Sequence, residues 1–320
     1  MDWSAWRAEF PILARKTYLN SCSLGALSRR AERRIAEFHE QWHEHGASAW
    51  YELWLGALSA LRARVASMLG ATPAEIALTA STSVALSSIA SAVDYRERPR
   101  VIVSELDFPT LAYQWIVRPD VEVVRVPSDD GVTVDPQRFR DAVDERTAFL
   151  ATSHVFFTTG AIQDLLALAD IAHAKGALFL VDAYQGVGQV PIDADASGAD
   201  ILVAGPLKWL LGGPGLAYLY VRNDLIRELR PTIAGWFGGR NQFAFDIASF
   251  EFHDDARRFE LGTPALPTVH AALGGQEIID EVGVPAIRRR NAELTERLIE
   301  AARGTTPRDL RNRALVELLY

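Results

Sequence analysis

The pattern that most constrains the fold is a series of short apolar runs that alternate with helical segments after Gly70. Strands that are apolar throughout and separated by helices of about ten residues indicate a mostly parallel sheet covered on both faces. The sequence therefore predicts an α/β fold. The expected strands lie near residues 76–79, 100–104, 121–126, 147–152, 177–181, 201–204 and 216–221, with helices near 83–93, 109–115, 136–143 and 163–175.

The two ends of the chain are expected to be helical. Apolar residues recur at helical spacing within residues 28–46, and a second helix is expected over residues 51–69. Residues 231–262 are rich in Gly, Phe and Asn, which favours an extended active-site or interface loop. We expect an N-terminal helical arm at 1–60, a large domain at 61–266 and a shortened C-terminal helical segment at 267–320.

Composition narrows the class of protein. The 320 residues are 49% hydrophobic, enough to bury a large core. A net charge of −8 without a basic cluster argues against nucleic acid as a partner. The N-terminus does not resemble a signal peptide and no run of about 18 apolar residues exists, so we expect a cytoplasmic protein without a membrane partner. The single cysteine, Cys22, leaves no internal disulfide and no multi-cysteine zinc site.

Two strand ends carry the residues that indicate chemistry. One strand ends in Asp182, with Gln185 one turn on, and the next leads to Lys208 between Leu207 and Trp209. A lysine among apolar neighbours loses hydration, which favours the neutral amine that can form a Schiff base. An aspartate at a strand end can hold a proton on a ring nitrogen, as pyridoxal phosphate (PLP) requires. Each residue alone is common in α/β proteins, but their order and spacing predict a PLP site.

A hydroxyl-rich segment at residues 78–83 leaves one strand and opens a helix. The unpaired N–H groups and positive dipole end of a helix N-terminus bind anions, and hydroxyl groups add further donors. An ordinary N-cap would explain the same residues, because Ser and Thr cap many helices. The segment is therefore a candidate phosphate site.

These segments resemble the class V aminotransferase family of fold-type I PLP enzymes, which includes kynureninases, cysteine desulfurases and isopenicillin N epimerases. The resemblance extends over roughly residues 18 to 275. Gly-Trp-Phe-Gly at residues 235–238 and Phe-Pro at residues 108–109 are closer to kynureninases than to desulfurases. The matching segments also include Asn-Ser-Cys-Ser-Leu-Gly at 20–25, Thr-Ser-His-Val at 152–155 and Phe-Glu-Leu-Gly-Thr-Pro at 259–264.

The resemblance implies a role for each matching residue. Lys208 and Asp182 are the expected catalytic residues: Lys208 holds PLP as a Schiff base and relays the Cα proton, and Asp182 keeps the pyridine nitrogen protonated. The protein is expected to be a homodimer, in which a threonine of each subunit reaches the phosphate in the other. The remaining expected cofactor contacts are Ser81, Thr82 and Ser83 at the phosphate, Phe108 stacked on the ring, Thr159 near the ring, Gln185 at the ring oxygen, Trp236 in the Gly-Trp-Phe-Gly loop and Thr263 from the second subunit.

The sequence departs from the family in two places. Gly205, Pro206 and Leu207 replace the Ser or His that precedes the lysine, so one phosphate or substrate contact is expected to be missing. Relatives continue through a C-terminal domain that brings the arginine for the substrate carboxylate, and the surroundings of Arg311 and Arg313 do not match that arginine. We therefore expect an open site, and C-terminal helices that expose apolar side chains.

These observations lead to one expected function with alternatives. We expect a PLP enzyme that acts on an amino acid, a small-molecule substrate, by cleaving a bond at Cβ, as a kynureninase-like hydrolase or a C–S lyase. An aminotransferase or epimerase of the same family stays open, because PLP serves all of these reactions. A PLP-binding protein with little catalysis is the alternative from another class. The run His39-Glu40-x-x-His43 also satisfies the zinc-peptidase motif, but no third ligand stands out, so no metal site is expected.

Overall fold

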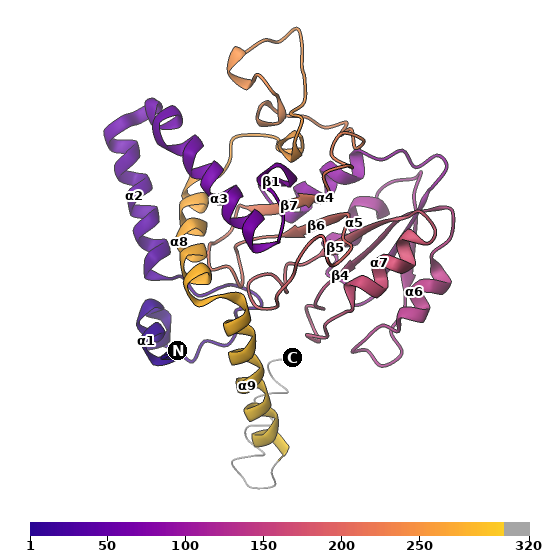
Figure 1. Ribbon diagram of the computed structural model, residues 1–320, viewed down its shortest axis with the longest axis horizontal. Helices are drawn as coiled ribbons and strands as arrows, with labels where there is room; N and C mark the ends of the chain where they lie inside the picture. Colours follow the sequence, from indigo (N-terminus) through magenta and orange to yellow (C-terminus); the bar gives the residue numbers. More distant parts are fainter. Residues whose placement is uncertain (304–320) are drawn as a thin grey trace.

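The computed structural model describes residues 1–303 and has an α/β architecture built on one seven-stranded sheet (Figure 1). The strand order is β1-β7-β6-β5-β4-β2-β3. Neighbouring strands from β6 to β3 are parallel, whereas β7 is antiparallel to both β1 and β6. The predicted mostly parallel sheet is confirmed. Its strands are β1 (Ile76–Thr79), β2 (Arg100–Ser104), β3 (Glu122–Val126), β4 (Thr147–Ser153), β5 (Leu178–Asp182), β6 (Ile201–Ala204) and β7 (Ala217–Val221).

Helices cover both faces of the sheet. Successive residues of one strand point to opposite faces, so Leu202 and Val203 of β6 belong to two different apolar clusters. The cluster of Val203 contains α4 (Thr82–Ser91) and α5 (Thr110–Ile116). The cluster of Leu202 contains Phe38 of α2 (Arg29–His45) and residues of four further helices. These are α3 (Leu55–Met68), α6 (Pro136–Ala142), α7 (Leu165–His173) and α8 (Leu266–Val282).

The N-terminal helices pack against the C-terminal part of the described chain. After α1 (Trp3–Trp6), helix α2 (Arg29–His45) lies along α8, and Arg34 of α2 pairs with Glu277 of α8 (Figure 1). Helix α9 (Val284–Arg303) extends away from the body and exposes apolar side chains, as expected. Single-turn helices lie at Arg7–Glu9, Pro11–Ala14, Gly46–Ser48, Trp50–Trp54, Pro73–Glu75, Trp236–Gly238, Gln242–Ala244 and Ala256–Phe259.

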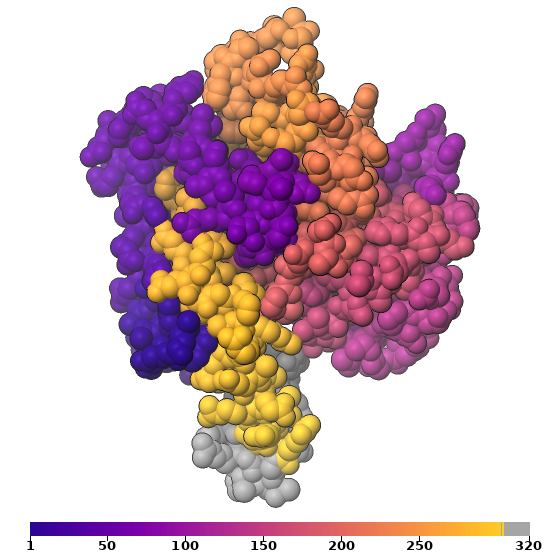
Figure 2. Space-filling model, viewed as in Figure 1, coloured from indigo at the N-terminus to yellow at the C-terminus, as the bar shows by residue number. Residues whose placement is uncertain are grey.

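The segment at 231–262 forms the expected extended loop between β7 and α8. It projects from the body of the molecule as the orange segment at the top of Figures 1 and 2. Within this loop Phe245 is 70% exposed and Ile247 is fully exposed, so the loop presents apolar surface to its surroundings. No helix within residues 1–303 is both long and apolar enough to cross a membrane.

The helix ends differ from the predicted ones by a few residues. Helix α7 begins at Leu165 rather than at 163, because Asp164 is its N-cap and accepts a hydrogen bond from the backbone N–H of Ala167 at 3.2 Å. Helix α3 begins at Leu55 because the preceding residues, Trp50–Trp54, form one wider π-type turn. The expected domain limits at 60 and 266 stay a prediction, and Arg311 and Arg313 lie outside the described residues.

Candidate functional site

A cavity of about 260 Å³ lies at the carboxyl ends of β5 and β6. The carboxyl ends of parallel strands meet at one edge of a sheet, which is where open α/β folds bind ligands. Asp182 is the last residue of β5, and Lys208 follows β6 after a short turn. The N-terminus of α4 reaches the same cavity from β1. Seven of the predicted residues line it together: Ser81, Thr82, Ser83, Phe108, Asp182, Gln185 and Lys208.

Burial shapes the charge states of Asp182 and Lys208. The Asp182 carboxylate is buried and accepts the backbone N–H of Tyr184 at 2.9 Å. Desolvation raises the pKa of Asp182, while that hydrogen bond and the Lys208 charge oppose the rise. Desolvation lowers the pKa of Lys208, against the attraction of Asp182. The loss of hydration therefore favours a neutral, nucleophilic amine on Lys208, as its apolar neighbours predict.

The hydroxyl groups at the start of α4 divide into two roles. The Ser81 hydroxyl accepts the backbone N–H of Val84 at 3.2 Å and acts as the N-cap of the helix. The Thr82 hydroxyl is buried beside the cavity and has no hydrogen-bond partner within residues 1–303. A buried unpaired hydroxyl costs about 1–3 kcal/mol, so an acceptor bound in the cavity would offset that cost. The helix N-terminus with its free hydroxyl fits the phosphate of PLP.

Aromatic rings form the walls of the cavity around Lys208. The Lys208 Nζ atom lies 5.8 Å from the ring centroid of Phe108 and 5.1 Å from that of Tyr184. Phe108 and Phe157 meet edge to face, with centroids 5.2 Å apart. Phe108 is 45% exposed, so this wall faces the mouth of the cavity. A planar ring bound beside Lys208 would find apolar surface against which to pack.

Tyr184 is a cavity residue that sequence reasoning missed. Burial and the neighbouring Asp182 raise the pKa of its phenol to about 12, so the hydroxyl stays protonated at neutral pH. A Cβ atom added at Gly205 would lie 2.7 Å from the Tyr184 hydroxyl. Gly205, which the sequence marks as the loss of a polar contact, is thus the residue that leaves room for this ring. The signal that could have revealed Tyr184 is its place between Asp182 and Gln185.

The N-terminal segment packs against the lysine-bearing turn. The backbone N–H of Gly25 donates to the Leu207 carbonyl at 2.8 Å. A Cβ atom at Gly25 would meet the Lys208 carbonyl oxygen at 2.1 Å, so only glycine permits this approach. The Tyr18 hydroxyl closes the segment on itself by donating to the Leu24 carbonyl at 2.6 Å. The contact places residues 20–25 beside Lys208.

Asp107 is a buried carboxylate behind the cavity wall, and sequence reasoning passed over it. It accepts the backbone N–H groups of Ser104 and Ser153, each at 2.7 Å, and the hydroxyl groups of Ser153 and Thr152 at 2.7 and 3.1 Å. Desolvation nevertheless raises the pKa of Asp107 to about 7. These bonds join the carboxyl ends of β2 and β4 and fix the backbone directly before Phe108.

Three of the expected cofactor contacts lie outside this cavity in the described part of the chain. The Thr159 hydroxyl donates to the Val132 carbonyl at 2.9 Å, where the chain turns at Gly160. Trp236 packs its ring against Phe237 in the projecting loop, with centroids 4.7 Å apart. Thr263, which the resemblance assigns to the site of a second subunit, is exposed. Sequence motifs placed Thr159 and Trp236 near the cofactor of the same chain, and their positions depend on turns that the motifs do not specify. The contact of Thr263 with a second subunit stays a prediction.

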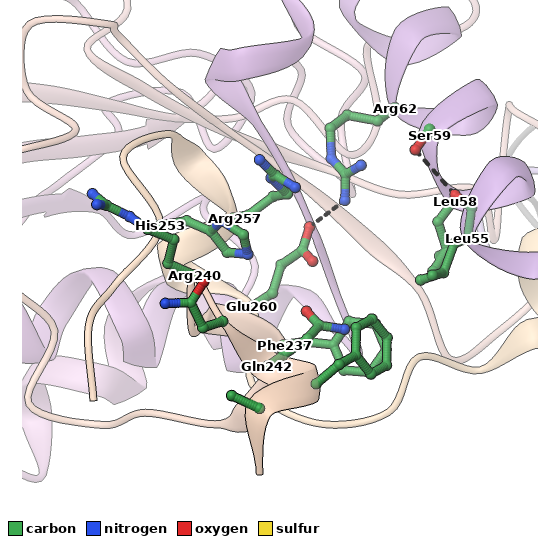
Figure 3. A pocket seen from close by; sticks show the side chains of 13 residues that line it. Leu55, Leu58, Ser59, Arg62, Phe237, Arg240, Gln242, His253, Arg257 and Glu260 are labelled. Carbon is green, nitrogen blue, oxygen red and sulfur yellow. Dashed lines mark hydrogen bonds and ion pairs between the residues drawn. The ribbon is translucent and has the colours of Figure 1, made fainter. Parts of the chain in front are cut away.

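A second, larger cavity of about 500 Å³ lies between α3 and the projecting loop (Figure 3). The buried Arg62 and Glu260 form an ion pair of 2.7 Å at its wall. Glu260 also accepts the backbone N–H of Leu78 at 2.9 Å, and Arg62 Nε donates to the Ile76 carbonyl at 3.1 Å. Other arginines that line this cavity also pair with carboxylates: Arg257 with Asp255 and Arg240 with Asp254. The ion pair at this cavity thus holds the backbone of β1 in place. None of the predicted site residues lines the cavity.

The zinc-peptidase motif lies on an exposed face of α2. His39, Glu40 and His43 are all exposed, and no group of three or more His, Cys, Asp or Glu residues within residues 1–303 is placed to hold a metal ion. Helix α2 packs against the rest of the protein through Phe38, whereas the three residues of the motif lie on its exposed side.

Comparison with known proteins identifies relatives over most of the chain. The family model "Aminotransferase class-V" matches residues 18–306. The "Uncharacterized aminotransferase YcbU" of Bacillus subtilis (strain 168) is 36% identical over 283 residues, 88% of this chain and 74% of that protein. The kynureninase of Geobacillus thermodenitrificans is 31% identical and covers 91% of this chain and 71% of its own length. A C-DES variant with glycine covalently linked to its PLP cofactor superposes with a TM-score of 0.85 at 20% identity, over 92% of this chain and 79% of that one.

Proposed function

The chain belongs to the class V aminotransferase family of PLP-dependent enzymes, and we propose that it converts an amino acid in the cavity that contains Lys208 and Asp182. One observation carries this proposal. A desolvated amine, a buried carboxylate and an unpartnered hydroxyl at a helix N-terminus face one cavity, as a PLP site requires. Bound PLP supplies an electron sink for negative charge at the carbon atoms of the substrate.

Each residue has a separate task in this proposal. The Lys208 amine is the covalent attachment point for PLP and afterwards carries a proton to or from the Cα atom of the substrate. Asp182 holds a proton on the pyridine nitrogen, and the start of α4 binds the phosphate through Thr82 and backbone N–H groups. Phe108 covers one face of the ring and excludes water. Gln185 contacts the ring oxygen.

We propose bond cleavage at Cβ as the reaction, on an amino acid with an apolar or aromatic β-substituent. Phe108 and Phe157 form an apolar wall beside Lys208, which suits such a substituent. The Phe-Pro and Gly-Trp-Phe-Gly segments favour kynureninase-like chemistry, and the 31% identity to a kynureninase agrees with this assignment.

A transamination is the second candidate. It is favoured by the 36% identity to a Bacillus subtilis protein named as an aminotransferase. A screen of amino acids with and without a 2-oxo acid separates the two reactions. Cleavage at Cβ releases the β-substituent without any 2-oxo acid acceptor, whereas transamination consumes the acceptor in proportion to product.

We also propose a homodimer in which Thr263 of one subunit contacts the phosphate held by the other. The exposed apolar side chains of the projecting loop, including Phe245 and Ile247, support a contact between subunits. Light scattering should give twice the mass of one chain. A monomer that binds PLP fully and is unaffected by Thr263→Ala contradicts this assembly.

Reduction with borohydride tests the attachment point directly. Peptide mapping after reduction should find a pyridoxyl group on Lys208. Lys16 and Lys175 are the other lysines of the sequence, and Lys175 is held in an ion pair with Glu145 at 2.7 Å. A label on either of them, with Lys208 unmodified, refutes the assignment.

A further inference from the structure

Two neighbours fix the side-chain amide of Gln185 at the edge of the PLP cavity. Its Nε2 atom donates to the backbone carbonyl of Cys22 at 2.9 Å, and its Oε1 atom accepts the indole N–H of Trp209 at 2.9 Å. Gln185 lines the cavity, whereas Cys22 and Trp209 lie outside its lining among the described residues. Three distant segments of the chain therefore meet at one amide group.

The chemistry of these two neighbours allows a single orientation of the amide. An indole N–H can only donate, so the atom that faces Trp209 must be the amide oxygen. A backbone carbonyl can only accept, so the atom that faces Cys22 must be the amide nitrogen. With the amide reversed, its nitrogen would face the indole N–H, donor against donor, and its oxygen would face the Cys22 carbonyl, acceptor against acceptor. Gln185 is thus held by its partners in one of its two possible orientations.

The fixed orientation decides what Gln185 can offer a ligand. The amide nitrogen carries two hydrogen atoms, and within the described residues it has one acceptor, the Cys22 carbonyl. The second N–H is therefore available to an acceptor in the cavity. The amide oxygen is already engaged by Trp209, which makes Gln185 a donor rather than an acceptor toward the ligand.

The turn that carries Gln185 is itself packed against the turn that carries Trp209. Gly188 has a φ of 93°, and a Cβ atom added there would lie 3.1 Å from the Trp209 carbonyl oxygen. The Gln189 side chain donates to the Gln185 carbonyl at 2.6 Å. The backbone beneath the amide is therefore supported independently of the indole hydrogen bond, so removal of that bond should leave the turn in place.

From this geometry we propose that Trp209 is a positioning residue that holds Gln185 as a hydrogen-bond donor, so that the cavity selects the ionised, accepting form of the PLP ring oxygen. The inference rests on the proposed function, because it assigns a ligand to the free N–H. Trp209 follows Lys208 directly in the sequence. The residue next to the attachment lysine thereby determines that Gln185 donates a hydrogen bond to the ring oxygen rather than accepting one.

The test compares Trp209→Phe with Trp54→Phe in the PLP-loaded enzyme. Trp54 is a matched control because its indole N–H also donates to a glutamine oxygen, that of Gln41 at 3.0 Å, away from the cavity. Two quantities are measured: the dissociation constant for PLP, and the pH midpoint of the visible absorbance change of the bound cofactor. Trp209→Phe should raise the dissociation constant by about two- to tenfold and move the midpoint upward, since the ionised oxygen loses an oriented donor.

Variants at Gln185 test the same hydrogen bond to the ring oxygen and can be used if Trp209→Phe disturbs folding. Gln185→Glu can still accept from Trp209 but cannot donate to the ring oxygen, so it should weaken PLP binding more than Trp209→Phe does. In a Gln185→Ala background, Trp209→Phe should have no further effect, because the two residues act through one contact.

Each outcome bears on the inference. Equal behaviour of Trp209→Phe and Trp54→Phe, wild-type PLP binding by Gln185→Glu, or additive effects of the double change would each overturn it while leaving PLP on Lys208. A wild-type protein that carries no PLP on Lys208 overturns the proposed function together with the inference.

Discussion

Replacement of Asp107 by asparagine should change how the free energy of unfolding depends on pH. Burial raises the pKa of Asp107 from 3.8 to about 7 in the folded protein. Between these values the folded state binds the proton more tightly than the unfolded state does, so stability is lost as the pH rises through about 7. For a single group with these pKa values, the loss between pH 5 and pH 7 is about 2 kcal/mol.

The measurement is urea unfolding of both proteins at pH 5, 6, 7 and 8, at the same PLP concentration. The difference between wild type and Asp107→Asn isolates this carboxyl group from other titrating groups. The wild type should lose about 2 kcal/mol relative to the variant between pH 5 and pH 7, and little more at pH 8. The reasoning is refuted if the difference in unfolding free energy between wild type and variant stays constant with pH, or if wild type gains stability relative to the variant as the pH rises. Either result would show that the four hydrogen-bond donors around Asp107 outweigh its desolvation.

Three further substitutions test other contacts. Asp182→Asn should retain PLP but lose most turnover, because the ring nitrogen loses its ionic partner; a rate within about threefold of wild type would contradict this role. Thr82→Val should weaken PLP binding by about 1.5–3 kcal/mol, the value of a hydrogen bond to a charged group, measured by equilibrium dialysis against wild type. Glu260→Gln should lower the unfolding free energy by about 3–5 kcal/mol, because it leaves the buried Arg62 charge without its partner, and an unchanged melting temperature would exclude that account.

The parts of the fold that could be predicted depend on local pattern. Strands such as β2 and β6 are apolar along their length because both faces of the sheet are covered, and the structure has them at the predicted residues. Asp182 and Lys208 could be placed in one cavity because both follow parallel strands, whose carboxyl ends share an edge. These inferences require no knowledge of contacts between distant segments.

The parts that could not be predicted are contacts across long stretches of sequence. Arg62 and Glu260 are separated by 198 positions, and no periodicity connects them. The indole of Trp209 and the carbonyl of Cys22 meet at Gln185 only after three loops are folded. Thr159 shows the converse, because its motif was visible while the turn that directs its hydroxyl to Val132 was not.

The way in which Arg62 and Glu260 hold β1 has a consequence for aggregation. β1 and β3 are the two outermost strands of the sheet, and an outermost strand with free backbone groups can recruit a strand from another molecule. On β1, the Leu78 N–H and the Ile76 carbonyl are already occupied by the ion pair. On β3, Glu122 and Arg125 place exposed charges along the strand, a second way to discourage such pairing. A protein that loses Glu260 should therefore form β-rich aggregates on heating, starting from the edge that the ion pair protects.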